Sequence, residues 1–389
     1  MIQIDTNYLL NTLKQMIRIN SVIPHEEKLA AYVADKIREL GLEPEWHKVA
    51  PGRPNVYARA DLGSSNRFLT LTGHMDTVDV AHNWPTDPFE PVEKEGKLYG
   101  LGSMDMKGGL ACALTAFKAL VEAKAWHGRL GHIGFAATVD EEGYGTGARA
   151  LLDTEYGASD AMLLGEPFYG AGNGWALPNG ITGKVLYKLT VTGRTAHAFH
   201  PERGVNAVED AGKIVAALEQ LSLGEHPLFG RGNYSTLKFE GGYKEYAVVV
   251  PEHCEVIITR LTVPGESVAT AVTDMQALID SLNLASQVTI ETPPPFYEPY
   301  LLAETSSIFR AFKPAYEQVI GQVPHFVPQK GITDSNIYVA EGNIPTIVFG
   351  PRGSGAHEAG EYVEIATLEP ATRVYVDTAV RFFQQVGSG

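Results

Sequence analysis

The sequence is poor in cysteine and has no long apolar run. Only two of its 389 residues are cysteines, Cys112 and Cys254, and both stand among apolar neighbours. A disulfide framework is therefore excluded, and two buried free thiols in a reducing compartment are expected. No stretch of about 18 uninterrupted apolar residues occurs, so the sequence does not predict a membrane-spanning helix.

Basic residues are also scarce relative to acidic ones. The chain has 31 Lys and Arg against 46 Asp and Glu, a formal net charge of −15. This balance argues against nucleic acid or an anionic membrane as the partner. The N-terminus, MIQIDTNYLLNTLKQ, lacks the basic and apolar segments of a signal peptide, so we expect a cytoplasmic protein. A cluster of the many carboxylates could serve a metal ion.

What the sequence does have is an alternation of apolar strands and helices. Its length exceeds what one hydrophobic core usually supports, so two domains are expected. In the first part, this order predicts an α/β domain with a largely parallel sheet covered by helices. The predicted strands are 55–60, 68–72, 130–139 and 160–164, and the predicted helices are 9–17, 24–41, 108–123 and 146–152.

The pattern changes around Pro178-Asn179-Gly180. The segment 184–192, KVLYKLTVT, alternates apolar and polar residues and predicts a half-solvated strand. The elements that follow, up to residue 291, complete a β-α-β-β-α-β order, which is typical of a ferredoxin-like module. After three prolines the chain returns to a helix, a strand at 345–349 and a C-terminal helix. We therefore predict a catalytic domain of residues 1–178 plus 297–389, interrupted by an inserted domain of residues 179–296.

Polar residues with metal-binding chemistry follow several of the predicted strands. His74 and Asp76 come after the strand 68–72, and residues two apart at a strand end point the same way. The carboxyl edge of a parallel sheet is where such proteins bind ligands. His74 is thus a candidate metal ligand, and Asp76 a carboxylate that orients its imidazole. Taken alone, a His-x-Asp pair is weak support for a metal site.

Further carboxylates stand at comparable positions. Asp105 lies among glycines, which allow tight turns and close approach. The run Asp140-Glu141-Glu142 follows a strand, and three like charges in a row are costly unless a cation compensates them. Singly, each of these is an ordinary turn or loop residue.

Two more candidates complete the set. Glu166 follows the strand 160–164, and His357 follows the strand 345–349. Two histidines, three carboxylates and one spare glutamate would support two metal ions that share a bridging carboxylate. Nitrogen and oxygen ligands without thiolates suit zinc, cobalt or manganese. The spare glutamate would act as general base.

At this point the chain resembles a known family. The motifs GHMDTV, YGLGSMDMKGG, TVDEEGYGTGA, LLGEP, GRTAHAFHPERGVNA and GITDSNIY…GAHEAGEYV cover nearly the whole chain in the right order. The sequence is similar to the dimetal aminoacylase and carboxypeptidase superfamily, which includes acetylornithine deacetylase, succinyl-diaminopimelate desuccinylase and glutamate carboxypeptidase. The resemblance implies a zinc-peptidase-type catalytic domain with an inserted lid and dimerisation domain, and hence a homodimer.

The resemblance also implies a role for each cluster residue. His74 and Glu166 would bind one ion, Glu142 and His357 the other, and Asp105 would bridge them. The peptide bond after Asp105 is expected to be cis.

The remaining roles that the resemblance implies concern proton transfer and substrate binding. Asp76 would orient His74, and Glu141 would be the general base. His197 would reach into the partner subunit's site and stabilise the oxyanion, and Arg260 would pair with the substrate carboxylate.

The chain departs from the family pattern at two positions. Val248 stands where relatives often have Asn, and Ile258 stands where they often have an acidic residue. Both departures weaken inference of a particular substrate.

The function expected is metal-dependent hydrolysis of the amide bond in an N-acyl amino acid or short peptide with a free carboxylate. A glutamate carboxypeptidase-like or dipeptidase-like activity is the alternative within this chemistry. A non-catalytic relative that binds a metabolite is the alternative of another class, and the complete set of candidate residues disfavours it. A single-domain dimetal aminopeptidase is disfavoured by the inserted domain.

Overall fold

The computed structural model describes residues 1–167, 176–245 and 247–385. The chain forms two compact units. The first comprises Met1–Asn179, Leu302–Val327 and Thr333–Gly389, and the second comprises Gly180–Leu301 and Pro328–Ile332. Within the described residues, no helix is long and apolar enough to cross a membrane. Both cysteines are buried and free, which confirms the expected absence of a disulfide.

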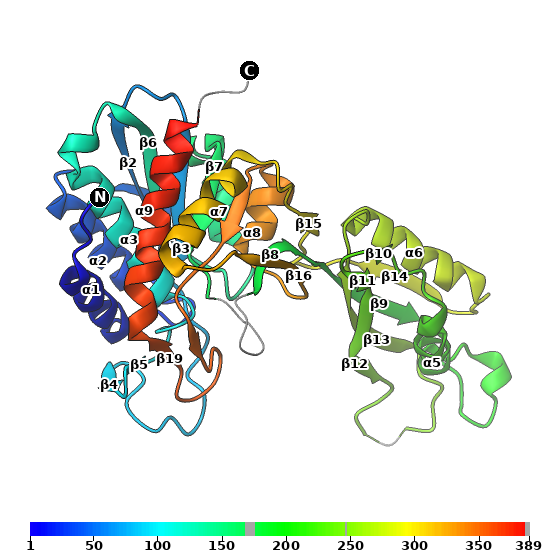
Figure 1. Ribbon diagram of the computed structural model, residues 1–389. Coiled ribbons are helices and arrows are strands. Elements are labelled where there is room, and N and C mark those ends of the chain that lie inside the picture. The colour runs from blue at the N-terminus through cyan, green and yellow to red at the C-terminus, as the bar shows by residue number, and fades with distance from the viewer. Residues whose placement is uncertain (168–175, 246, 386–389) are drawn as a thin grey trace. The chain divides into compact units, whose positions relative to one another are not determined.

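The first unit is built on a six-stranded sheet with the order β1-β2-β6-β3-β7-β17 (Figure 1). Strands β6, β3, β7 and β17 pair in parallel, whereas β1 and β2 join them antiparallel. The predicted, largely parallel sheet is therefore confirmed. The strands are β1 (Glu45–Ala50), β2 (Arg53–Gly63), β3 (Phe68–His74), β6 (Arg129–Thr138), β7 (Ala161–Leu164) and β17 (Thr346–Val348).

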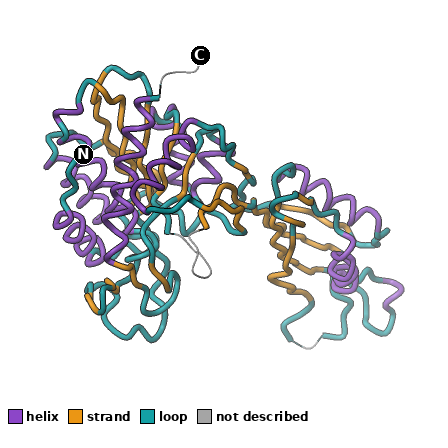
Figure 2. The backbone as a smooth tube through the Cα atoms, in the orientation of Figure 1, coloured by secondary structure: helices purple, strands orange, loops and turns teal. Residues whose placement is uncertain are grey.

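Helices flank this sheet (Figure 2). Every residue of β3 is buried, as expected of a strand that is covered on both faces. Helix α3 packs on β3 and β6, and α9 packs on α3 and α7. The helices are α1 (Thr6–Arg18), α2 (Glu27–Glu39), α3 (Lys107–Glu122), α4 (Thr146–Leu152), α7 (Ser307–Ile320), α8 (Asp334–Asn336) and α9 (Leu368–Gln384).

Two details of this unit differ from the sequence prediction. Helix α2 begins at Glu27 rather than near Pro24, because its first helical hydrogen bond is donated by Ala30 N–H to the carbonyl of Glu26. Strand β1 was not predicted, because as an edge strand it is largely exposed and shows no clear apolar alternation.

A small sheet brings two distant loops of the first unit together. Its order is β18-β19-β5-β4, formed by β18 (Gly353–Ser354), β19 (Tyr362–Glu364), β5 (Lys97–Tyr99) and β4 (Val92–Lys94). Strand β19 pairs antiparallel with β5, with Tyr362 opposite Tyr99. The chain before β19 therefore lies beside the chain after β5, and these are the segments that carry His357 and Asp105.

The second unit has the predicted ferredoxin-like order. Strands β9, β12, β13 and β14 form an antiparallel sheet with the order β12-β13-β9-β14, and α5 and α6 are the two intervening helices. Apolar side chains from both helices and from β9 and β13 form its core. The elements are β9 (Gly183–Thr192), α5 (Ala207–Ala217), β12 (Asn233–Gly241), β13 (His253–Thr262), α6 (Val268–Ser281) and β14 (Gln287–Glu291).

Further short strands lie outside these sheets. Strand β8 (Ala176–Ile181) pairs with β15 (Tyr300–Leu301), and β10 (Glu225–His226) pairs with β11 (Gly230–Arg231). Strand β16 spans His325–Gln329.

Candidate metal centre

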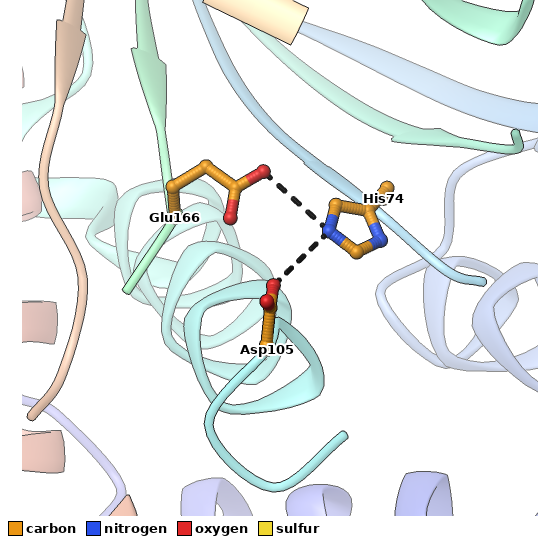
Figure 3. A group of neighbouring side chains, drawn as sticks. All are labelled: His74, Asp105 and Glu166. Atoms are coloured by element: carbon orange, nitrogen blue, oxygen red, sulfur yellow. Dashed lines mark ion pairs between the residues drawn. The ribbon is translucent and has the colours of Figure 1, made fainter. Parts of the chain in front are cut away.

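The candidate ligands gather at the carboxyl edge of the parallel sheet. The register places His74 opposite Thr138, the last residue of β6, and Thr72 opposite Leu164, the last residue of β7. Residues that follow these strands therefore start from one edge. Figure 3 shows His74, Asp105 and Glu166 pointing toward one another, from β3, from the segment before α3 and from the segment after β7.

His74 is oriented for metal binding by its own hydrogen bond. Its Nδ1 lies 2.9 Å from the carbonyl oxygen of Asp76. A carbonyl oxygen only accepts, so Nδ1 carries the proton and, in the neutral ring, the lone pair is on Nε2. This Nε2 is buried, has no hydrogen-bond partner among the described residues and lies 3.4 Å from both Asp105 Oδ1 and Glu166 Oε1. A third carboxylate oxygen, Glu141 Oε2, lies 3.9 Å from the same Nε2.

A second group of ligands shares Asp105 with the first. His357 Nε2 lies 2.8 Å from Glu142 Oε1 and 3.4 Å from Asp105 Oδ2. The two oxygens of Asp105 thus face two different histidines, one in each group. A carboxylate in this position can bridge two cations.

The electrostatics of the cluster favour positive charge. Burial, and next repulsion by Glu166, raise the pKa of Glu141 well above its usual range. Burial is also the largest cause for Glu166, and repulsion by Asp105 adds to it, so the pKa of Glu166 is raised well above its usual range too. Burial alone would lower the pKa of His74, but the carboxylates around it raise the pKa well above its ordinary value. Bound cations would relieve the repulsion among these carboxylates.

The donor set fits metal ions. Among the residues that the structure describes, three groups of side chains have potential ligand atoms within 4.8 Å of one another: His74–Asp105–Glu166, His74–Glu141–Glu142 and Asp105–Glu142–His357. Besides His74 Nε2, the oxygen Glu166 Oε1 is buried without a hydrogen bond in the described part of the chain. Buried polar atoms normally have partners, so two orphan atoms aimed at one point are suited to a cation.

Asp76 contacts the His74 ring and also a neighbouring loop. Its carboxylate Oδ1 lies 3.6 Å from His74 Nδ1, while its main-chain carbonyl takes the ring's hydrogen bond. The other carboxylate oxygen accepts a hydrogen bond from Glu142 N–H at 2.9 Å. Asp76 therefore connects the end of β3 to the loop that carries Glu141 and Glu142.

The run of three acidic residues is divided by the fold. Asp140 has φ = +72° and its carboxylate turns to Arg53 Nη1, 2.9 Å away. Arg53 also donates from Nε to both carboxylate oxygens of the fully buried Glu26, at 3.1 and 3.0 Å. The cation that compensates Asp140 is thus an arginine, and Glu141 and Glu142 alone belong to the cluster.

Sequence reasoning missed Arg53, Glu26 and a further buried acid, Asp334. Asp334 accepts a hydrogen bond from Thr138 Oγ1 at 3.3 Å, and burial raises its pKa to about 7. For Asp334, the only indication in the sequence was that it lies in the motif GITDSNIY, which is shared with the family. No local pattern identifies the partner of Arg53.

Arg260 pairs with acidic residues of its own unit. Its side chain is fully buried in the second unit, where Nη2 bonds to Glu266 and, at 2.9 Å, to Asp274 Oδ2. Cys254, Val256, Ile258 and Arg260 alternate inward along β13, so the arginine belongs to the inner face of the sheet. That Arg260 binds the substrate carboxylate stays a prediction, and its guanidinium here is already paired with two acids.

His197 belongs to the second unit, as its position in the sequence requires. It lies on an exposed segment, where its Nδ1 accepts a hydrogen bond from Phe199 N–H at 3.2 Å. Its ring also packs beside those of Phe199 and His200.

The peptide bond between Asp105 and Met106 is cis, as the resemblance implied.

Comparison with known proteins identifies the family. The sequence profile of peptidase family M20/M25/M40 matches residues 70–381. The chain is 27% identical over 387 residues to a succinyl-diaminopimelate desuccinylase of Magnetococcus marinus, covering 96% of this chain and 98% of that protein.

Solved structures share the fold. Aminopeptidase PepT from Bacillus cereus superposes with a TM-score of 0.79 at 21% identity, covering 97% of this chain and 99% of that one. The Bacillus subtilis protein YXEP, a dinuclear metal binding peptidase, superposes with a TM-score of 0.73 at 15% identity, covering 96% and 97%. With the family profile matching most of its length, the chain belongs to peptidase family M20/M25/M40, whose members are metal-dependent amide hydrolases.

Proposed function

We propose that this protein is a dimetal hydrolase of N-acyl amino acids or short peptides with a free carboxylate. The observation that carries the proposal is the position of Asp105, whose two oxygens lie 3.4 Å from His74 Nε2 and 3.4 Å from His357 Nε2. His74 and Glu166 would hold one ion, and Glu142 and His357 the other. The relatives named succinyl-diaminopimelate desuccinylase support this chemistry.

Zinc is the ion we propose, with cobalt and manganese as alternatives. The side chains of the three ligand groups offer imidazole nitrogen and carboxylate oxygen and no thiolate, a set that suits these borderline ions. The ions would supply Lewis acidity toward the scissile carbonyl and the attacking water.

Glu141 is the proposed general base. Its carboxylate lies in the cluster, 3.9 Å from His74 Nε2, and so is farther from the imidazole than Asp105 or Glu166. It would take a proton from the attacking water as the oxygen adds to the carbonyl carbon. It would then give that proton to the leaving nitrogen as the C–N bond breaks, releasing an amine and a carboxylic acid, which ionises to the carboxylate.

We assign the catalytic role to residues 1–178 plus 297–389 and a lid and dimerisation role to the insertion 179–296. Strand β12 is an edge strand with exposed Leu237 and Phe239, a surface that a second copy could cover. In such a homodimer, His197 of the partner subunit would stabilise the oxyanion.

The dimer can be tested with charged substitutions on this edge. Light scattering should show a smaller species for Leu237→Lys/Phe239→Lys, but not for Val323→Lys, a control at an exposed residue of the first unit. A wild-type protein that is monomeric at micromolar concentration would contradict the proposal.

The substrate is best identified by direct assay. Zinc- or cobalt-loaded protein should be tested against N-succinyl-diaminopimelate, N-acetylornithine, other N-acyl amino acids and dipeptides. A preference in kcat/KM of about 10³ or more would identify the class, since one methylene alone changes it only about 10–200-fold. Hydrolysis that continues unchanged after exhaustive chelation would refute the metal-dependent mechanism.

A further inference from the structure

A buried carboxylate outside the ligand cluster joins two of the loops that build it. Glu361 is 1% exposed and follows His357 on the same loop. Its carboxylate accepts three main-chain hydrogen bonds, from the N–H groups of Gly102 at 2.7 Å, Met104 at 2.7 Å and Asp105 at 2.9 Å.

The segment that receives this carboxylate is shaped to bind an anion. Residues 100–106 connect β5 to α3 and contain Gly100 and Gly102, with φ of +153° and +76°. These are conformations that favour glycine, and here they accompany a turn in which three N–H groups, of Gly102, Met104 and Asp105, point to one place. The group in that place is the side chain of Glu361, whose two carboxyl oxygens accept the three N–H groups.

One of these bonds fixes the backbone of the residue between the two histidines. Glu361 Oε1 holds the N–H of Asp105, while the Asp105 side chain lies 3.4 Å from His74 and 3.4 Å from His357. A shift of the Asp105 backbone would move its carboxylate relative to both imidazoles.

Glu361 is itself held on both sides. Its carbonyl accepts a hydrogen bond from Gly100 N–H at 3.1 Å, and the next residue, Tyr362, pairs with Tyr99 in the small sheet. His357 precedes it in a tight loop that has a turn bond from Glu358 N–H to the carbonyl of Gly355 at 2.9 Å. Glu361 therefore lies at the junction of the loop that carries Asp105 and the loop that carries His357.

We propose that Glu361 is a positioning residue that couples these two loops and so sets the position of Asp105 between the two metal ions. The proposal rests on the dimetal function proposed above. It assigns Glu361 no contact with substrate or metal. Its loss should weaken metal binding and lower kcat while KM changes little, because the reacting groups move and the substrate-binding surface does not.

The test is a cobalt titration of the full-length protein, followed by its visible absorption. Glu361→Gln keeps the shape of the side chain, but its single acceptor oxygen cannot serve all three N–H donors and its amide N–H₂ opposes at least one of them. We expect at least one of two cobalt-binding steps to weaken by about 10-fold or more, the usual effect of losing a partner behind a metal ligand. kcat of the loaded variant should fall by a similar factor.

The control is Glu358→Gln, the same chemical change at an exposed carboxylate on the same loop. It should leave both cobalt-binding steps and kcat unchanged. Glu361→Asp keeps the charge but shortens the side chain, and cobalt affinity between that of the wild type and that of Glu361→Gln is expected. This variant also serves as the test if Glu361→Gln does not fold.

The outcomes separate this proposal from the function on which it rests. Wild-type protein that binds two cobalt ions, together with a Glu361→Gln variant of equal cobalt affinity and kcat, would overturn the positioning role alone, even if the variant melts at a lower temperature. Wild-type protein that binds fewer than two cobalt ions would instead overturn the dimetal function.

Discussion

Replacing Arg53 by methionine should destabilise the first unit strongly, because it leaves two buried carboxylates without their cation. The side chains of Arg53, Glu26 and Asp140 are 14%, 0% and 2% exposed. Removing one partner of a buried ion pair costs about 3–5 kcal/mol, since the remaining charge stays buried and uncompensated. We expect Arg53→Met to fall in this range at neutral pH.

Arg38→Met is the matched control. Arg38 also pairs with an aspartate, Asp35, at 2.8 Å, close to the 2.9 Å between Arg53 and Asp140, but the side chains of Arg38 and Asp35 are 46% and 69% exposed. An exposed pair contributes only about 0–1 kcal/mol. The two variants therefore remove the same kind of side chain from bonds of similar length and differ in burial.

The assay is urea unfolding of chelated protein, followed by tryptophan fluorescence. All four tryptophans lie within residues 1–179, so the signal reports on the first unit. With an m-value of about 3 kcal/mol/M, a loss of 3–5 kcal/mol lowers the midpoint by about 1–1.7 M. If Arg53→Met loses no more than Arg38→Met, the triad does not stabilise the fold and the reasoning from burial is wrong.

The pH dependence provides a second check. Burial raises the pKa of Glu26, and the hydrogen bonds from Arg53 lower it, so removing Arg53 should raise it further. A carboxyl whose pKa is higher in the folded state than in the unfolded state binds more protons when folded, and its penalty shrinks as pH falls. The deficit of Arg53→Met relative to wild type should therefore be largest above the folded pKa of Glu26 and smaller in acid.

Three further predictions concern the site and Arg260. Glu141→Gln should keep its metal but lose about 10²–10⁴ in kcat, the range for a general base, and near-wild-type kcat in the loaded variant would remove Glu141 from the mechanism. Arg260→Met should lower the melting temperature of the second unit by calorimetry, because Glu266 and Asp274 lose their partner. Its KM should stay within about twofold of wild type, and a tenfold rise would support Arg260 as a substrate ligand. Hydrogen bonds to Asp105 and Glu142 raise the pKa of His357 to about 10, so metal binding should release protons and strengthen as pH rises. Calorimetry in buffers of different ionisation enthalpy would show this, and an absence of proton release would contradict it. The same pairing should stabilise chelated protein fully below the unfolded pKa of histidine, near 6.5, and be lost as pH rises through about 10.

The architecture was largely predictable from the sequence, because it depends on local periodicity. Apolar runs of strand length predicted β3, β6 and β7, and the alternation in 184–192 predicted β9. Parallel strands bring their carboxyl ends to one edge, so the residues just after them could be expected to meet. This is why His74, Glu166 and the pair Glu141-Glu142 were found by position alone. The choice of Glu142 as the ligand, and the pairing of each ligand with a particular ion, came from the resemblance.

Only the tertiary structure decided which charges neutralise one another. Asp140 turns to Arg53 and leaves the ligand cluster, and Arg260 turns inward to Glu266 and Asp274. The inward position of Arg260 was visible in the alternation along β13, but its acidic partners were not. Glu361 reaches N–H groups that are more than 250 residues away in the chain. Strand and helix patterns repeat over a few residues, whereas ion pairs and hydrogen bonds depend on distances in space, which folding alone establishes.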